Sequence, residues 1–217
     1  MDELELLREE ALHFGIALSD PQLHRFRVYL DELWEWNSRI NLIGMDTRKR
    51  VVMELFLDSL MPAPYLPDNG KMLDVGSGAG FPGIPLKIFL PDYALHIVEP
   101  KAKRVGFLRQ AIRLLGLERA LVVHGRIEES GPALFSTGYD VVTAKALAPL
   151  GRTITLCAPS VAAGGLLVCF LGTELDEVLK SAEREVGENG LALFKQVPYQ
   201  IPGKRSRRWI CFFLKES

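Results

Sequence analysis

Apolar residues in the first part of the chain recur with the spacing of an α-helix. Leu23, Phe26 and Leu30 lie three or four positions apart, which places them on one face of a helix. Ser19 precedes this pattern and is a residue type that caps helix N-termini, with a glutamine three residues further on to complete a capping box. Helical spacing returns at about 48–60. The pattern predicts a helical N-terminal region.

The pattern changes after residues 61–70, which contain three prolines and a glycine and so disfavour regular structure. We place a boundary here, between a helical region at 1–66 and a second domain at 67–217. Short apolar runs then alternate with helical patterns. Strands are expected at about 72–75, 95–99, 121–124, 140–144, 165–171, 193–197 and 209–214, with helices at 82–89, 103–115 and from the end of the fifth strand to about 186. This alternation predicts an α/β fold with a mainly parallel sheet, helices on both faces and an antiparallel closing pair.

A glycine-rich loop follows the first of these strands. The residues at 74–80 read Asp-Val-Gly-Ser-Gly-Ala-Gly, so glycines at alternate positions allow a sharp turn and remove side chains that would keep a ligand away. The spacing differs from the Gly-x-Gly-x-x-Gly of dinucleotide folds. An acid before the first glycine suits a ligand with a cationic amino acid group, such as S-adenosylmethionine. The loop could also be a purely structural turn, but its place after the first strand favours ligand binding.

Two further segments follow neighbouring strands. Glu99 ends the second strand, where a carboxylate can accept hydrogen bonds from both hydroxyls of a ribose; the alternative is an acid that caps the next helix. Residues 125–129 follow the third strand, where backbone groups could contact the adenine edge. Arg126 in this segment could instead be a surface residue whose stem packs on the ring.

Lys145 follows the fourth strand. If S-adenosylmethionine is the ligand, a substrate would meet its methyl group here. Its ammonium could hold a base or a phosphate, or it could simply extend from the strand end to solvent. The candidate cofactor-binding residues are Asp74, Gly76, Ser77, Gly78, Gly80, Phe81, Glu99, Arg126, Ile127, Glu128 and Lys145.

The net charge of −1 gives no overall signal for nucleic acid. Basic residues are nevertheless clustered at 48–50, 101–113 and 204–208, whereas acids collect at 2–10 and 176–188. Each basic cluster alone could be a solvated face. Together they predict a basic face that could bind phosphates.

Several classes of function are disfavoured. No apolar run approaches the ~18 residues of a membrane span, and the acidic start at 2–5 is unlike a signal peptide. Three isolated cysteines in apolar surroundings favour a reducing compartment, and the four histidines lack metal-ligand spacing. We therefore expect a cytoplasmic protein without a metal or a membrane partner.

The motifs together resemble the RsmG (GidB) family of bacterial methyltransferases of small-subunit ribosomal RNA. The most specific stretch is 73–86, where Pro-Gly-Ile-Pro continues the glycine loop. Further matches are Trp36-Asn37, Asn41-Leu42, Leu57-Asp58-Ser59, Lys103-Arg104-Val105, Phe107-Leu108, Gly125-Arg126-Ile127-Glu128 and Ala144-Lys145-Ala146. The resemblance implies a Rossmann-like S-adenosylmethionine-dependent methyltransferase fold with a helical N-terminal extension.

The resemblance also implies an activity: methylation of N7 of one guanosine in 16S ribosomal RNA, either free or in the 30S subunit. We treat the protein as a monomer. Asn37 and Lys145 are the candidates for contacting the guanine. The chain departs from the family pattern at three places, with Lys145 for an arginine, Glu54-Leu55 for Arg-His, and Leu171 for a lysine.

Guanine N7 carries an in-plane lone pair and is unprotonated at neutral pH, so its methylation needs no general base. Alignment of the reacting atoms can then contribute up to about 7–11 kcal/mol. Two alternatives remain open. A methyltransferase of the same fold acting on another acceptor would show no RNA-dependent turnover. A cofactor-binding RNA-binding protein without catalysis would bind RNA and transfer no methyl group.

Overall fold

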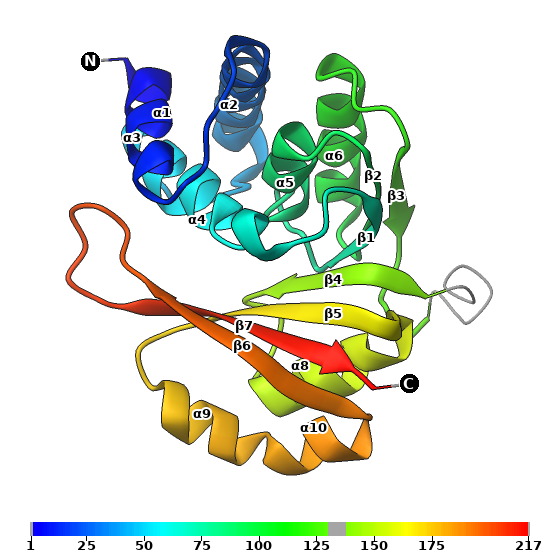
Figure 1. Cartoon of the computed structure of the whole chain (residues 1–217). Coiled ribbons are helices and arrows are strands. Elements are labelled where there is room, and N and C mark those ends of the chain that lie inside the picture. Colours follow the sequence, from blue (N-terminus) through cyan, green and yellow to red (C-terminus); the bar gives the residue numbers. More distant parts are fainter. Residues whose placement is uncertain (1, 130–137, 217) are drawn as a thin grey trace.

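The computed structural model describes residues 2–129 and 138–216, and within them the chain forms one mixed sheet of seven strands. The strands are β1 (Gly70–Val75), β2 (Tyr93–Glu99), β3 (Ala120–His124), β4 (Tyr139–Lys145), β5 (Val161–Leu171), β6 (Leu191–Tyr199) and β7 (Arg208–Lys215). Their order across the sheet is β3-β2-β1-β4-β5-β7-β6 (Figure 1). β1 to β5 are parallel, and β7 runs antiparallel between β5 and β6.

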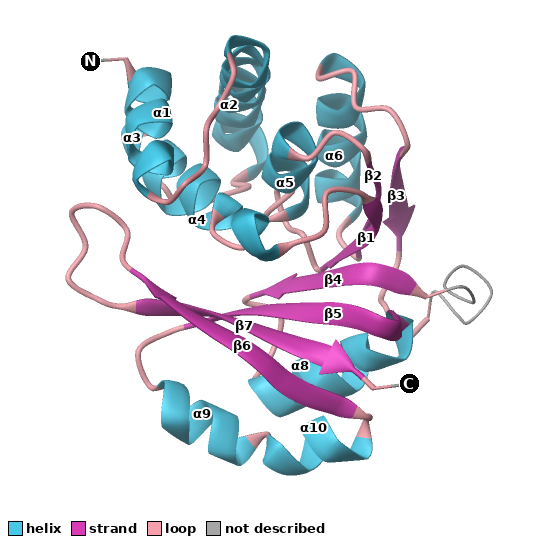
Figure 2. Ribbon diagram, viewed as in Figure 1, coloured by secondary structure: helices cyan, strands magenta, loops and turns pink. Residues whose placement is uncertain are grey.

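Helices cover both faces of the sheet (Figure 2). One face carries α1 (Glu3–His13), α2 (Asp20–Ile40), α3 (Arg48–Val51), the π-helix η1 (Val52–Leu57), α4 (Asp58–Leu60), the 3-10 turn η2 (Ala63–Tyr65), α5 (Gly83–Phe89) and α6 (Ala102–Leu114). The other carries α8 (Leu150–Cys157), the 3-10 turn η3 (Ala158–Ser160), α9 (Leu175–Ser181) and α10 (Glu183–Glu188). In the part of the chain that is described, no helix is both long and apolar enough to cross a membrane.

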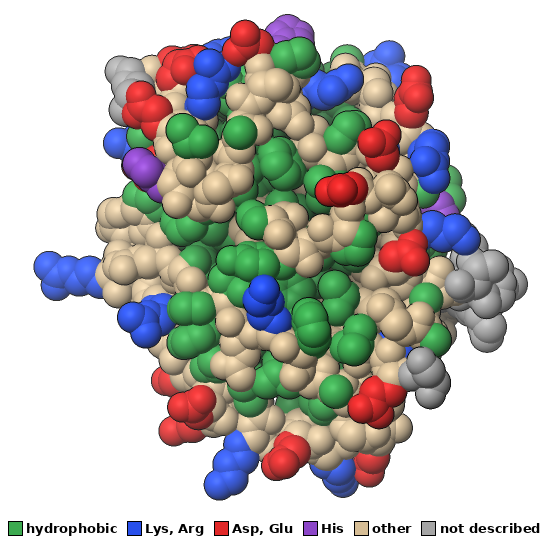
Figure 3. Space-filling model, in the orientation of Figure 1, with side chains coloured by type: hydrophobic (Ala, Val, Ile, Leu, Met, Phe, Trp, Pro, Cys, Tyr) green, Lys and Arg blue, Asp and Glu red, His purple; other side chains and the backbone are tan. Residues whose placement is uncertain are grey.

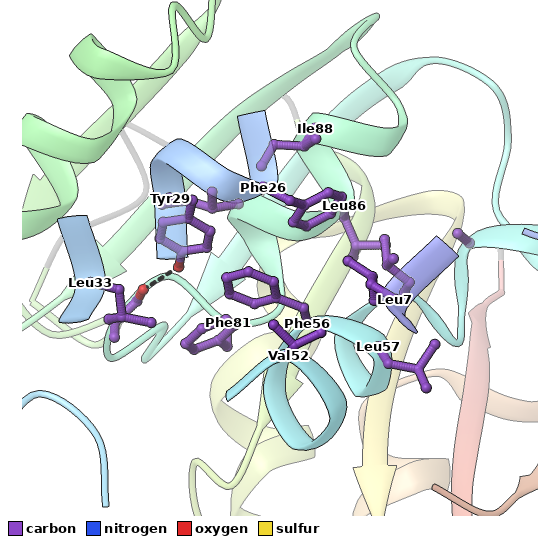
Figure 4. Close-up of a cluster of buried hydrophobic side chains, with 14 of the residues drawn as sticks. Leu7, Phe26, Tyr29, Leu33, Val52, Phe56, Leu57, Phe81, Leu86 and Ile88 are labelled. Carbon is purple, nitrogen blue, oxygen red and sulfur yellow. Dashed lines mark hydrogen bonds between the residues drawn. The ribbon is translucent and has the colours of Figure 1, made fainter. Parts of the chain in front are cut away.

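Neighbouring residues of β1 enter different cores, as the twofold repeat of a strand requires. Met72 belongs to the core under the N-terminal helices, whereas its neighbour Leu73 belongs to the core under α8. The first core contains Phe26 and Phe56 of the N-terminal region (Figure 4). Phe212 of β7 belongs to the same core. Residues on both sides of the expected 66/67 boundary therefore share one apolar core, and the division into 1–66 and 67–217 stays a prediction.

The structure confirms the α/β fold class, the seven expected strands and the antiparallel closing pair. The capping box at the start of α2 is present, since the backbone N–H of Ser19 donates to Gln22 Oε1 over 2.9 Å. Three details differ. The helix expected at 48–60 has a π-helical middle, the last helix divides at Ala182, and α8 was not predicted.

Candidate active site

The strand order places a ligand site at one edge of the sheet. β1 lies between β2 and β4, so the chain winds outward in opposite directions on its two sides. In open α/β sheets, ligands bind at such a reversal, beside the carboxyl ends of the strands. The glycine loop after β1, Glu99 at the end of β2, the 125–129 segment after β3 and Lys145 at the end of β4 all lie at that edge.

The glycine loop needs its glycines for space as well as for conformation. Gly76 has φ +69°, and a Cβ there would lie 2.6 Å from Leu147 Cδ1. Gly80 has φ +98°, and a Cβ there would meet the Tyr29 hydroxyl at the same 2.6 Å. Gly78 differs because the first atom near its missing Cβ is Arg104 Nη1, at 3.7 Å. The loop is closed against the protein at two glycines and leaves room at the third, which fits a cradle for a ligand.

Asp74 organises this loop from below. Its side chain is fully buried and accepts hydrogen bonds from the Ser77 hydroxyl, from Gly83 N–H over 3.0 Å and from the Thr143 hydroxyl over 2.8 Å. Burial raises the pKa of the Asp74 carboxyl above its usual value, and these bonds offset only part of that effect. The contacts tie both ends of the loop to one carboxylate.

Tyr29 connects the N-terminal helices to the same loop. It is fully buried in α2, and its hydroxyl donates to the backbone carbonyl of Ala79 (Figure 4). Its ring stacks on Phe56 at 5.2 Å between centroids and packs against Phe81 at 5.7 Å. Aromatic side chains from α2 and η1 thereby hold the outer side of the loop in place.

Glu99 closes the other side of the loop. Its Oε2 accepts from Gly78 N–H over 2.9 Å, and its Oε1 accepts from Lys101 N–H over 3.0 Å. The side chain is 1 % exposed, and Arg104 Nη1 lies 4.0 Å from Oε1. Each carboxylate oxygen can accept more than one hydrogen bond, so the ribose role predicted for Glu99 remains compatible with these contacts.

A pocket of about 270 Å³ lies beside Glu99 and is lined by Gly76, Val98, residues 125–128 and Leu147. Ile127 is half-buried and packs on the core under α8, whereas Arg126 is exposed with Glu129 3.9 Å away. Glu128 pairs with Arg152 of α8 over 3.1 Å. Backbone groups and apolar side chains therefore form the inner wall, and the charged side chains lie at the rim. This mixture suits a nucleoside, because its ring needs apolar contact and its edges need hydrogen bonds.

Lys145 belongs to a buried cluster of charges. Its Nζ lies 2.5 Å from Asp58 Oδ2, and the same carboxylate accepts from the Tyr199 hydroxyl and from Arg208 Nη1, each over 2.7 Å. The ammonium lies 5.9 Å from the ring centroid of Phe81. The cluster joins α4, the end of β4 and the last two strands at the edge of the glycine loop.

The cations of this cluster, Lys145 and Arg208, favour the ionised form of the Asp58 carboxyl. Burial alone would raise the pKa of the Asp58 carboxyl, but Lys145, the Tyr199 hydroxyl and Arg208 together hold it below its usual value. Burial and the neighbouring carboxylate raise the pKa of Tyr199, so this phenol stays protonated and acts as a donor. Tyr199 is 6 % exposed, and its hydroxyl is used in this bond.

The remaining predicted residues have structural partners. Asn37 Oδ1 accepts from Ile43 N–H over 2.8 Å and so holds the turn after α2. Trp209 packs on the core under α8, and the three cysteines, which lie in apolar surroundings, are buried. Among residues 2–129 and 138–216, no group of three or more His, Cys, Asp and Glu side chains could hold a metal ion.

Sequence reasoning assigned no role at the site to Asp58, Arg208 or Tyr29. Asp58 had appeared only as part of a family motif and Arg208 only within a basic cluster. The partners Asp58 and Arg208 are 150 positions apart, so no local pattern could show their contact. Tyr29 was not among the residues of the predicted helical pattern, and its bond to Ala79 joins positions 50 apart in the sequence.

The fold and the glycine cradle define a Rossmann-like methyltransferase. The structure resembles that of M. jannaschii TYW2 in complex with AdoMet, with a TM-score of 0.64, 11% identity, and coverage of 82% of this chain and 80% of that one. It also resembles a precorrin-6y C5,15-methyltransferase from Geobacter metallireducens GS-15, with a TM-score of 0.52, 18% identity, and coverage of 81% and 92%.

The sequence identifies the family within this class. Residues 22–202 match the family model for rRNA small subunit methyltransferase G, and the chain belongs to this family. It is 35% identical to the ribosomal RNA small subunit methyltransferase G of Alkaliphilus metalliredigens over 93% of this chain and 86% of the relative. It is 34% identical to that of Staphylococcus saprophyticus over 97% and 89%. The predictions of a methyltransferase and of S-adenosylmethionine as its cofactor are confirmed by this membership.

Proposed function

We propose that this protein transfers a methyl group from S-adenosylmethionine to N7 of a guanosine in 16S ribosomal RNA. The observation that carries the proposal is that the glycine cradle and the Lys145 cluster lie side by side where the strand order reverses. The glycine cradle and its pocket lie at the ends of β1 to β3, and the Lys145 cluster lies at the adjacent end of β4. Because the chain belongs to a family named for methylation of small-subunit ribosomal RNA, we assign the first feature to the cofactor and the second to the RNA.

The cofactor side uses mainly the backbone. Gly76, Gly78 and Gly80 form the cradle, Glu99 accepts from the ribose hydroxyls, and the segment 125–128 contacts the adenine. Asp74 acts through the loop that it holds, because its side chain is buried and bonded to Ser77, Gly83 and Thr143. When bound, S-adenosylmethionine supplies a methyl group activated by its positively charged sulfur.

The RNA side uses Lys145. A guanine presents two acceptors on its major-groove edge, O6 and N7, and a lysine commonly donates to this edge. We assign Lys145 to O6, which leaves the N7 lone pair free to accept the methyl group. Asn37 remains a second candidate contact through its amide Nδ2, because its Oδ1 already holds the turn after α2.

Asp58 has an electrostatic role in this scheme. Methylation of N7 leaves a positive charge on the base, and a bare ammonium beside it would oppose that change. The buried carboxylate of Asp58, 2.5 Å from Lys145 Nζ, offsets the ammonium charge while leaving its other N–H groups to donate. No general base is required, so alignment of the guanine is the main contribution of the protein.

Extruding a stacked base costs a few kcal/mol, so an unpaired guanosine in partly folded RNA or in the 30S subunit is the favoured substrate. We place the protein in the cytoplasm, acting as a monomer.

The test is incubation of the purified protein with methyl-labelled S-adenosylmethionine and unmodified small-subunit RNA, both free and in 30S subunits, followed by N7-specific strand cleavage. We expect label at a single guanosine. Label on another acceptor, or cofactor and RNA binding without any transfer, would overturn the proposal in favour of one of the two alternatives stated above.

A further inference from the structure

A second basic feature lies beside the Lys145 cluster, where the loop between β6 and β7 approaches the start of η1. A groove of about 230 Å³ separates the two segments, and its walls include Lys49, Arg50, Glu54 and Lys204. The groove joins parts of the chain that are about 150 residues apart in sequence. It is distinct from the pocket beside Glu99, since the two share no lining residue.

Glu54 holds the two walls together. Its side chain is 8 % exposed, and its Oε1 accepts from Arg50 Nε over 2.7 Å and lies 3.0 Å from Lys204 Nζ. These cations lower the pKa of the Glu54 carboxyl, so it is ionised at neutral pH. Arg50 and Lys204 therefore have fixed positions on the groove, and each keeps more than a third of its side chain exposed.

The charge around the groove is strongly positive. Lys49, Arg50, Lys204, Arg205 and Arg207 supply five cations, whereas the acids close to them in sequence are Asp46 and Glu54. Lys49, Arg205 and Arg207 are exposed. Figure 3 shows lysine or arginine side chains projecting from the region of the β6–β7 loop. In a chain with a net charge of −1, this local excess indicates an anionic partner.

The groove is aligned with the proposed site of methyl transfer. Glu54 and Asp58 lie one helical turn apart on the same helical segment, and Lys204 and Arg208 lie four residues apart on the facing chain. The ion pairs Glu54–Lys204 and Asp58–Arg208 thus link these two elements at two successive positions. Four residues of an α-helix correspond to about 6 Å of rise. An RNA strand whose base reaches Lys145 would therefore pass its neighbouring phosphates over the groove.

From this geometry we infer that the groove between η1 and the β6–β7 loop binds backbone phosphates of the RNA strand that carries the target base. The inference rests on the proposed function for its partner, but its test does not require methyl transfer. Contacts to phosphates fix the register of a nucleic acid without reading its sequence. They would supply cations on the RNA side in a chain that has Glu54-Leu55 and Leu171 where the family usually has basic residues.

The experiment compares two double variants of the full chain. Lys49→Gln with Lys204→Gln neutralises the groove. Lys71→Gln with Lys180→Gln removes the same charge from exposed lysines at the start of β1 and on α9, away from the groove. The dissociation constant for unmodified small-subunit RNA is measured across a range of salt concentrations, and S-adenosylmethionine affinity is measured on the same preparations.

Loss of two phosphate contacts should reduce the slope of log K against log salt by about 1.4–1.8, from about 0.7–0.9 per phosphate. At a fixed moderate salt concentration, we expect the groove variant to bind RNA roughly fivefold more weakly. The control variant should keep the wild-type slope, and cofactor affinity should stay unchanged in both. Equal slopes in the groove variant and the wild type would overturn the inference, as would equal loss in the control.

A third variant gives an effect of opposite sign that a folding defect cannot produce. Glu54→Gln keeps the side-chain size and removes the negative charge shared by Arg50 and Lys204, so RNA should bind at least about twofold more tightly. Weaker or unchanged binding would contradict the groove. If the groove variants change RNA binding as expected but the wild type transfers no methyl group, the groove inference holds and the proposed function is overturned.

Discussion

Two buried aspartates support opposite sides of this site and do so with different chemistry. Asp74 is surrounded by hydroxyl and backbone N–H donors, and burial raises its pKa. Asp58 is surrounded by Lys145, Arg208 and the Tyr199 hydroxyl, which together lower its pKa. Neutral donors can order a loop without adding charge to the proposed cofactor side. Cations held by a carboxylate would give the proposed RNA side fixed donors, which a polyanion can use.

The two aspartates also differ in how their partners are distributed along the chain. Ser77 and Gly83 lie within nine residues of Asp74, so its loop is mostly a local structure. The partners of Asp58 come from the ends of distant strands, 141 and 150 positions away in the case of Tyr199 and Arg208. The glycine loop around Asp74 is held mostly by residues of one motif, whereas the cluster around Asp58 needs β4, β6 and β7 in place.

The largest expected effect is the difference in stability cost between removing a buried acid and removing an exposed one. Asp58→Ala leaves Lys145 and Arg208 without their shared carboxylate, and removal of one member of a buried charge cluster costs about 3–5 kcal/mol. Asp46→Ala removes an exposed acid that also pairs with an arginine, and should cost much less, because solvent screens exposed ion pairs. Urea unfolding of both variants measures the difference. Equal costs would mean that the Asp58 cluster contributes no more than a surface pair.

The next effect concerns the cofactor side alone. Glu99→Ala should weaken S-adenosylmethionine binding by about 1.5–3 kcal/mol, because hydrogen bonds to a charged acceptor are lost. Glu129→Ala, in the exposed segment beside the same pocket, is the matched control and should leave affinity unchanged. Titration calorimetry gives both values. Unchanged binding in the Glu99 variant would remove this residue from the proposed cofactor site.

A smaller effect tests whether the N-terminal helices support the glycine loop. Tyr29→Phe keeps the stacking on Phe56 but removes the donor to the Ala79 carbonyl, which should cost roughly 1 kcal/mol of stability. Cofactor affinity should fall with it, because the loop loses an anchor. Tyr65→Phe, at a partly exposed ring, should change neither quantity. A Tyr29 variant with normal cofactor affinity would show that the loop holds its shape without this bond.

The smallest effect is a difference in pH dependence. The stability that Asp58 contributes is present above the unfolded pKa near 3.8 and is lost as pH falls through its lowered folded pKa. For Asp74 the order is reversed, since its folded pKa is raised and its contribution is lost as pH rises through that value. Between about pH 3 and 7, the stability gap between wild type and Asp58→Asn should therefore shrink toward acid.

The gap for Asp74→Asn should instead grow toward acid, because the wild-type carboxyl becomes neutral there. Unfolding curves at several pH values for the three proteins decide the matter. Parallel trends for the two variants would contradict the assigned environments.

Much of the fold could be predicted from the sequence, because the spacing of apolar residues along each segment indicates its secondary structure. The short apolar runs predicted all seven strands, and Asp-x-Gly-x-Gly-x-Gly located the glycine loop after β1, which stays the predicted cofactor loop. The missed helix α8 has Leu150, Ile154 and Cys157 on one buried face, a spacing that was present but short. The parallel pairing of β4 and β5 requires a crossover there, which would have pointed to it.

The cluster around Lys145 and Asp58 was less predictable for a physical reason. Lys145 could be selected from its place after a strand, but a single sequence contains no signal for its pairing with Asp58. The π-helical turn at η1, which precedes Asp58 and contains Glu54, likewise has no simple sequence pattern. Charge clusters formed by distant strands and helices become visible only in three dimensions.

The Lys145→Met variant most directly tests the division into a cofactor side and an RNA side. It removes the ammonium and leaves Asp58 with Arg208 and Tyr199. Single-turnover methyl transfer to small-subunit RNA and S-adenosylmethionine affinity would be measured on the same preparation. We expect transfer to slow at least about tenfold, roughly 1.4 kcal/mol, with cofactor affinity within about twofold of wild type. An unchanged transfer rate, or a loss of cofactor affinity that matches the loss of rate, would contradict the assignment of Lys145 to the RNA side.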